Sequence, residues 1–412
     1  MKSRRAQIST LAVAGLALTS TFSGVAWASA EKVIHNFDGT PDGAAPNAGV
    51  ILDAAGNLYG TAAGGGSAGL GIVYELAPST SGAWTENILY SFQGGSDGAT
   101  PLGPLIFDQA GNLYGTTSNG GVYGGTVFEL IPNGDGTWAE KVLFRANAFG
   151  YPVYFRSSNM VFDAAGNLYG TSSRGGFGTG NVFELSPSPA GSWTMVSIYS
   201  FSYDELNNPT SLIIDAAGNL YGTTEYGGTS DFGEVFELSP SSTGWKINYP
   251  HNFKALPDGQ YPTGGVILDS GGNLYGTSSQ GGASSACSCG TVFRLKSSNG
   301  GTRWTEAVMK SFDGAPGSGP IAGVVMDSVN NLYGLTYYSG VEQGNEIGGV
   351  AFRINPMTGA YTLLHEFGAA GDGYGPLGTL AFGPGGNLFG TTWGGGSSQV
   401  YGDGGTVFEL QP

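Results

Sequence analysis

Near its start the chain reads Asp53-Ala-Ala-Gly-Asn-Leu-Tyr-Gly-Thr61, and related stretches recur along its whole length. Each copy follows an apolar triplet. The copies begin at Asp53, Asp108, Asp163, Asp215, Asp269 and Asp327, with a diverged seventh copy at Gly383. Successive copies lie 55, 55, 52, 54, 58 and 56 residues apart. A repeat of this period is typical of proteins that are built from stacked structural units.

Each repeat predicts four short strands. In the first unit these are strand A at residues 49–53, strand B at 58–62, strand C at 72–76 and strand D at 84–92. All four are rich in β-branched or aromatic residues and are bounded by Gly, Asn, Ser or Pro. Because propellers stack four-stranded sheets radially, the repeat predicts an all-β, seven-bladed β-propeller of antiparallel blades.

The two ends of the chain complement each other. Residues 31–38 match strand D, whereas the last unit stops shortly after its strand C, at Leu410. We therefore expect the N-terminal strand to complete the last blade, with residues 31–38 beside 405–410. Such a closed ring removes the free sheet edges of an open array.

Composition agrees with this architecture. The 412 residues include 75 Gly and 20 Pro, and only 11% are charged, against about 25% in an average domain. Collagen is excluded because the sequence has no Gly-X-Y period, and the share of hydrophobic residues, 40%, argues against disorder. The net charge of -16 argues against nucleic acid or an anionic membrane as partner.

Residues 1–30 are predicted to be a cleaved signal peptide. Lys2, Arg4 and Arg5 precede an apolar stretch at residues 11–18, and Ala28-Ser29-Ala30 offers a small-residue cleavage site. A single anchoring helix is the alternative, disfavoured because the segment is short. We expect residues 31–412 to form one seven-repeat domain, secreted or periplasmic, monomeric and without membrane insertion.

The repeated Asp-x-x-Gly-Asn-Leu-Tyr-Gly-Thr, the Gly-Gly that follows it, and the Gly-Thr-Val-Phe-Glu-Leu block of residues 125–130 resemble a known family. This family is the GloVer tandem repeat of exported bacterial proteins with a choice of C-terminal anchor. The resemblance covers residues 31–412 and implies export and a tandem-repeat fold rather than an activity. The sequence departs from the anchored members in ending at Pro412 without a sorting signal or helix.

Function is expected on the face that carries the variable B-to-C loops and the D-to-A crossovers, because rigid scaffolds usually present their sites on variable loops. Aromatic rings beside amides and a few charges suit a sugar. The alternative is that these residues only pack on neighbouring loops. The candidates for ligand binding are Asn119, Arg174, Glu225, Tyr226, Gln280, Tyr337, Tyr338, Glu342, Trp393 and Tyr401.

Two classes of function remain open. The first is a non-enzymatic binding or structural module for a glycan or an extracellular protein. The alternative is an exported hydrolase or lyase acting on a carbohydrate or lactone, for which Glu225 and Glu342 are the one candidate pair of carboxylates.

The remaining polar residues are expected to be structural, with no metal or cofactor. One Asp per unit cannot converge on a calcium ion, so Asp53, Asp108, Asp163, Asp215, Asp269 and Asp327 are assigned to turns. His35, His251 and His365 share one position in strand D, on separate blades. Cys287 and Cys289 are expected to form a local disulfide, with redox catalysis as the alternative.

Overall fold

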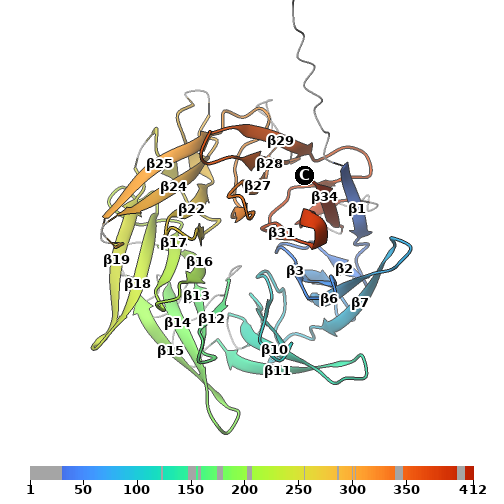
Figure 1. Cartoon of the computed structure of the whole chain (residues 1–412). Coiled ribbons are helices and arrows are strands. Elements are labelled where there is room, and N and C mark those ends of the chain that lie inside the picture. The colour runs from blue at the N-terminus through green and yellow to red at the C-terminus, as the bar shows by residue number, and fades with distance from the viewer. Residues whose placement is uncertain are drawn as a thin grey trace, which may run out of the picture.

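The computed structural model describes residues 30–121, 124–146, 155, 159–173, 180–201, 207–254, 256–284, 287–298, 300–301, 303–338, 347–396 and 404–412. Seven four-stranded antiparallel sheets follow one another around a ring (Figure 1). The predicted seven-bladed propeller is therefore confirmed.

The first blade runs from the centre outward as β3 (Ile51–Leu52), β4 (Leu58–Ala62), β6 (Ile72–Pro78) and β7 (Trp84–Ser91). Blades two to six repeat this order. The second and third blades comprise β8 (Ile106–Phe107), β9 (Leu113–Thr116), β10 (Thr126–Pro132) and β11 (Trp138–Arg145), and then β12 (Val161–Phe162), β13 (Leu168–Ser172), β14 (Asn181–Pro187) and β15 (Trp193–Ser200). The fourth to sixth blades comprise β16 (Pro209–Ile214), β17 (Leu220–Thr224), β18 (Glu234–Ser241) and β19 (Gly244–Asn252), then β21 (Val266–Leu268), β22 (Leu274–Ser278), β24 (Thr291–Ser298) and β25 (Arg303–Ser311), and finally β26 (Val325–Met326), β27 (Leu332–Thr336), β28 (Val350–Ile354) and β29 (Tyr361–Glu366).

The seventh blade joins the two ends of the chain. It comprises β31 (Ala381–Phe382), β32 (Leu388–Thr392), β34 (Thr406–Gln411) and, as its outermost strand, β1 (Ala30–Asn36). Strand β1 pairs antiparallel with β34 along its whole length, and Figure 1 shows the blue strand beside the red one. The N-terminal strand closes the ring, as the sequence predicts.

The hydrophobic core is divided among the boundaries between blades. At the closing boundary, Phe37, Phe389 and Val407 of the seventh blade pack with Tyr74 and the other buried residues of the first. Similar clusters lie at each of the other six boundaries. Because every blade buries both of its faces against neighbours, the ring forms a rigid scaffold for its loops.

Close contacts explain two of the repeated glycines. A Cβ atom at Gly115 would lie 2.4 Å from the ring of Phe128 on the neighbouring strand, so the Gly of Leu-Tyr-Gly-Thr makes room for the Phe of Val-Phe-Glu-Leu. A Cβ atom at Gly405, where φ is 127°, would lie 2.5 Å from Pro46 of the first blade. The repeated Gly and Pro thus mark contacts within and between blades.

The innermost strand of the first blade is shorter than predicted. Only Ile51 and Leu52 of residues 49–53 pair with β4, because the residues before them contact the seventh blade. The Ala48 carbonyl accepts a hydrogen bond from Thr391 Oγ1 at 2.8 Å, and a Cβ atom at Gly49 would meet the Thr379 carbonyl.

One short helix occurs among the described residues. The 3-10 turn η1 (Pro384–Gly386) joins β31 to β32 in the diverged copy of the motif. In the described part of the chain, no helix has the length and apolar character needed to cross a bilayer.

Candidate functional site

In five blades, the described parts of the B-to-C loop and of the D-to-A crossover are held together by backbone pairing. We call this side of the ring the loop face; it carries the B-to-C loops and the D-to-A crossovers. On this face, three short strands of the crossovers pair with three short strands of the B-to-C loops. The pairs are β2 (Gly43–Ala44) with β5 (Gly64–Gly65), β20 (Gly259–Gln260) with β23 (Gln280–Gly281), and β30 (Gly373–Tyr374) with β33 (Gly394–Gly395). Isolated bridges join Ala99 to Asn119 and Ser318 to Tyr338. These ladders fix the loops on the scaffold.

Seven of the ten predicted ligand-binding residues fall within the described chain, and the backbone pairing places all seven on the loop face. They are Asn119, Glu225, Tyr226, Gln280, Tyr337, Tyr338 and Trp393. The other three, Arg174, Glu342 and Tyr401, lie outside the described residues. Of the predicted carboxylate pair, only Glu225 is therefore described.

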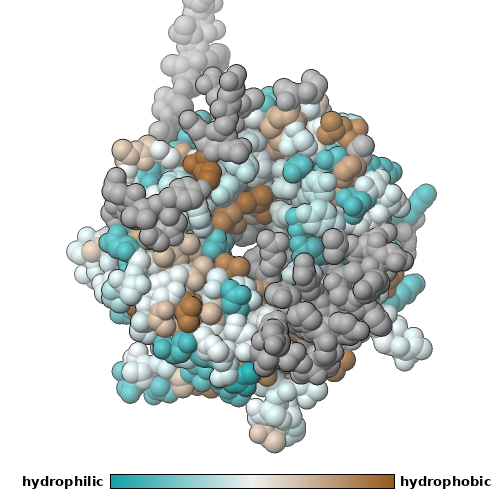
Figure 2. All heavy atoms as spheres, turned by 180° about the vertical axis from the view of Figure 1, so that it is seen from behind, coloured by the Kyte–Doolittle hydropathy of each residue, from teal (hydrophilic) through white to brown (hydrophobic). Residues whose placement is uncertain are grey.

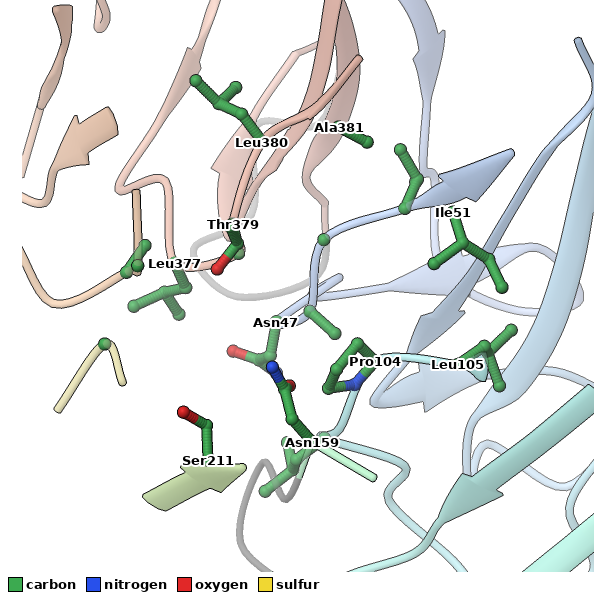
Figure 3. Close-up of a pocket in the computed structure, with 18 of the residues that line it drawn as sticks. Asn47, Ile51, Pro104, Leu105, Asn159, Ser211, Leu377, Thr379, Leu380 and Ala381 are labelled. Atoms are coloured by element: carbon green, nitrogen blue, oxygen red, sulfur yellow. The ribbon is translucent and has the colours of Figure 1, made fainter. Parts of the chain in front are cut away.

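A central channel runs between the innermost strands and encloses a cavity of about 490 Å³. Figure 2, which views the molecule from the side opposite to Figure 1, shows apolar residues at one side of its opening. Asn47, Asn159 and Ser211 turn their polar groups into the cavity (Figure 3), beside aliphatic side chains such as Leu377. The wall therefore combines neutral polar groups with apolar surface.

A second hollow of about 340 Å³ forms the mouth of this channel on the loop face. Six blades each contribute to it the residue that directly follows the repeated proline. These residues are Asn47, Leu102, Thr210, Thr263, Ile321 and Leu377. Sequence reasoning missed this ring, although variation immediately after a repeated proline was a signal that could have found it.

Glu225 lies at the rim of the mouth and is held in place by Asn208. Its backbone N–H donates to the Asn208 carbonyl at 3.1 Å, and the Asn208 side-chain amide donates to its carboxylate. Among the described residues that line the channel and the mouth, Glu225 is the one ionisable side chain. It can accept hydrogen bonds from a ligand that enters the mouth.

Aromatic side chains form three groups on the loop face. The ring of Tyr226 contacts Tyr261, with centroids 5.4 Å apart, and Tyr226 is 36% exposed. Tyr337 contacts Tyr338 with centroids 4.8 Å apart. Tyr374 and Trp393 form the third group, with centroids 6.3 Å apart. Edge-to-face contacts hold these rings in fixed orientations.

The six turn aspartates share one hydrogen-bonding pattern. In the third blade, Asp163 Oδ1 accepts from the backbone N–H groups of Ala165 and Asn167, and Oδ2 accepts from the Asn167 amide and the Tyr169 hydroxyl. Asp53, Asp108, Asp215, Asp269 and Asp327 repeat this pattern. Burial opposes the ionised form of Asp163, but these hydrogen bonds together lower its pKa below the usual range.

Each histidine lies beside two carboxylates that sequence reasoning did not connect with it. One is the aspartate seven residues later in the crossover, and the other is a glutamate on the outer strand of the next blade. These glutamates are Glu86 for His35, Glu306 for His251 and Glu31 for His365. His251 Nε2 lies 3.1 Å from Asp258, and His365 Nε2 lies 2.9 Å from Asp372. His35 has Asp42 and Glu86 as its neighbours. The spacing of seven was visible in the sequence, but the partner on the next blade depends on the fold.

Cys287 and Cys289 are joined by a disulfide bond in the B-to-C loop of the fifth unit. Both residues pack against the hydrophobic cluster that includes Phe312 and Val324, between the fifth and sixth blades. The bond therefore fixes a loop-face segment onto the core.

The fold and the site define a class of protein: a closed propeller of seven repeated blades, with a channel mouth among fixed loops. The chain belongs to the Gloeobacter/Verrucomicrobia repeat family, whose model matches residues 17–197, 156–341 and 251–412. No curated protein matches the sequence.

Two solved structures show the same kind of fold at low sequence identity. A putative 6-phosphogluconolactonase from Bacteroides uniformis is 14% identical, with a TM-score of 0.53, and the match covers 78% of this chain and 85% of that one. A fungal alcohol oxidase of the AA5 family, in complex with copper, is 14% identical, with a TM-score of 0.57 and coverage of 92% and 76%. At this identity the likeness concerns the fold alone.

Proposed function

We propose that this protein is an exported, non-enzymatic binding module that takes a neutral, hydroxyl-rich ligand, such as a glycan chain, at the loop face. The observation that carries the proposal is the mouth of the channel. It is ringed by amide, hydroxyl and aliphatic side chains, with Glu225 at its rim and the exposed ring of Tyr226 one residue further on.

This arrangement matches the chemistry of a sugar. The C–H face of a pyranose stacks on an aromatic ring, while its hydroxyls bond to amides and to a carboxylate. Such binding needs rings and polar groups in fixed positions, and the backbone ladders of the loop face provide them. A protein surface that presents tyrosine and amide groups is the other partner that this proposal allows.

Export is part of the proposal. It is supported by the basic and apolar pattern of residues 1–30 and by the disulfide between Cys287 and Cys289, since disulfides persist in oxidising compartments. The site of action would be the periplasm, the cell envelope or the medium. The net charge of -16 disfavours nucleic acid as the ligand.

A matched pair of variants tests the binding proposal. Tyr226 and Tyr249 both belong to the fourth blade and are 36% and 39% exposed, but Tyr249 lies on the outer strand β19. Residues 31–412 would be screened against a glycan array, followed by calorimetry with the oligosaccharide that binds best. We expect Tyr226→Ala to weaken binding by roughly tenfold or more, as for loss of a stacking ring, and Tyr249→Ala to leave it unchanged.

No binding to any glycan, or equal binding by the two variants, would contradict the glycan proposal. Binding only to an envelope protein, lost in Tyr226→Ala and kept in Tyr249→Ala, would retain the loop face and change the partner.

Glu225 favours one alternative, a hydrolase or lyase that acts on a carbohydrate or lactone in the mouth. A carboxylate at the rim of a channel could act as an acid or base. The test is turnover of lactones and glycosides by the wild type and by Glu225→Gln. Turnover that Glu225→Gln abolishes while binding persists would establish the alternative.

A further inference from the structure

The ring-closing strand β1 carries a histidine into a cluster that spans two blades. His35 lies on β1, the outer strand of the seventh blade. Asp42 lies in the crossover to the first blade, and Glu86 lies on β7, the outer strand of the first blade. The cluster therefore joins the three segments that meet where the ring closes.

The distances in this cluster differ from those of a hydrogen-bonded triad. His35 Nε2 lies 3.6 Å from Asp42 Oδ1 and 3.8 Å from Glu86 Oε1. Both distances exceed a normal hydrogen bond. They are close to the roughly 3.3 Å that separates two ligands around a tetrahedral ion when each bond is about 2.0 Å.

Two of the three atoms that face one another are buried and lack partners. His35 Nε2 and Glu86 Oε1 are shielded from solvent, and among the described residues neither has a hydrogen-bond partner. At the equivalent boundaries, His251 and His365 contact their aspartates directly, at 3.1 and 2.9 Å. Only the cluster at the closing boundary therefore leaves its histidine nitrogen unused.

Surrounding contacts fix two of the three side chains. The His35 ring lies edge-on to Phe37, with centroids 4.6 Å apart. The Asp42 carboxylate accepts the backbone N–H groups of Gly43 at 2.8 Å and Asp38 at 3.1 Å. Support of this kind orients ligands at metal sites.

The carboxylate oxygens of Asp42 and Glu86 and the imidazole nitrogen of His35 all lie within 4.8 Å of one another. A cation between these groups would offset the repulsion between the two carboxylates.

We propose that His35, Asp42 and Glu86 bind one divalent cation of the zinc class and so link the seventh blade to the first. One imidazole nitrogen and two carboxylate oxygens form a donor set that suits Zn²⁺ and the neighbouring transition metals better than Ca²⁺, which prefers six or more oxygens. Solvent would complete the coordination.

The test uses residues 31–412, stripped with a chelator and titrated with ZnCl₂ by calorimetry, with a parallel series of thermal melts. We expect one bound Zn²⁺ per chain and a higher melting temperature when it is bound. His35→Gln and Glu86→Gln should each weaken binding at least about tenfold, because each loses one of three protein ligands. His251→Gln, which changes a histidine at the same repeat position, should bind as the wild type does.

The Glu86→Gln variant is included in case His35→Gln fails to fold. Because Glu86 lies on β7, its substitution leaves the pairing of β1 with β34 intact. Circular dichroism of each metal-free variant would confirm its fold. The proposal is overturned if the wild type binds no zinc, if His35→Gln and Glu86→Gln bind like the wild type, or if His251→Gln loses binding equally.

Discussion

At the residue scale, the repeated motif is a set of contacts that the six copies with an Asp use in the same way. The Asp carboxylate caps the turn and accepts a hydrogen bond from the Tyr hydroxyl. In the second blade, the Tyr114 hydroxyl also lies 2.6 Å from the carboxylate of Glu129, to which it donates a second hydrogen bond. The Asp and the turn could be predicted from the sequence, because an Asp before a Gly-Asn turn has a known local role. The Tyr–Glu bond could not, because it depends on which strands are neighbours.

The contact between Gly115 and Phe128 gives a prediction for stability. Gly115→Ala should destabilise the protein by about 1–3 kcal/mol, because its Cβ would lie 2.4 Å from the Phe128 ring and 3.0 Å from Leu105 within a packed core. The control is Gly64→Ala, whose nearest neighbour, the Ala44 side chain, would be at an ordinary 3.4 Å. Urea denaturation would measure both. Equal losses would show that the close approach of the ring has no special role.

At the element scale, the blades are joined by contacts that no single repeat reveals. Thr61, Thr277 and Thr391 each donate from Oγ1 to a backbone carbonyl of the next blade. Trp138 of the second blade packs on Tyr59 of the first, with centroids 6.5 Å apart. The sequence shows that these residues recur, but it does not show that their partners lie on a neighbouring blade. The channel-mouth ring and the histidine clusters escaped prediction for the same reason.

One boundary between blades should make stability depend on pH. Glu140 on β11 lies near Asp97, which accepts the Tyr90 hydroxyl at 2.6 Å. Burial, then Asp97, raises the pKa of Glu140 from an ordinary 4.5 to about 7, and Arg145 only partly opposes this. Between these values the folded protein holds a proton that the unfolded chain has lost, so stability falls as pH rises.

Glu140→Gln should remove this loss. We expect the variant to be more stable than the wild type by about 1 kcal/mol at pH 8, after allowance for partial exposure, and the difference to vanish near pH 4, where both states of the wild type are protonated. Denaturation at the two pH values measures the effect. A difference that does not change with pH would rule out titration of Glu140 as its cause.

At the scale of the whole molecule, the fold follows from the seven repeats and from the match between the chain ends. The strand-like residues at the start and the missing outer strand at the end predict closure without knowledge of side-chain contacts. The function could not be predicted from the sequence in the same way. The binding face depends on how loops from different blades meet, and Arg174, Glu342 and Tyr401 lie outside the described residues.

Closure of the ring is the central claim, because it brings the first and seventh blades together around one channel mouth. The most direct test is the melting temperature of residues 31–412 compared with a chain that lacks residues 31–38. Both would be measured with a chelator present, so that any metal at His35 has no influence. The account predicts a sharp fall, because the deletion exposes the edge of β34 and opens the core around Phe37. A shortened chain that melts at the same temperature would contradict the closed ring.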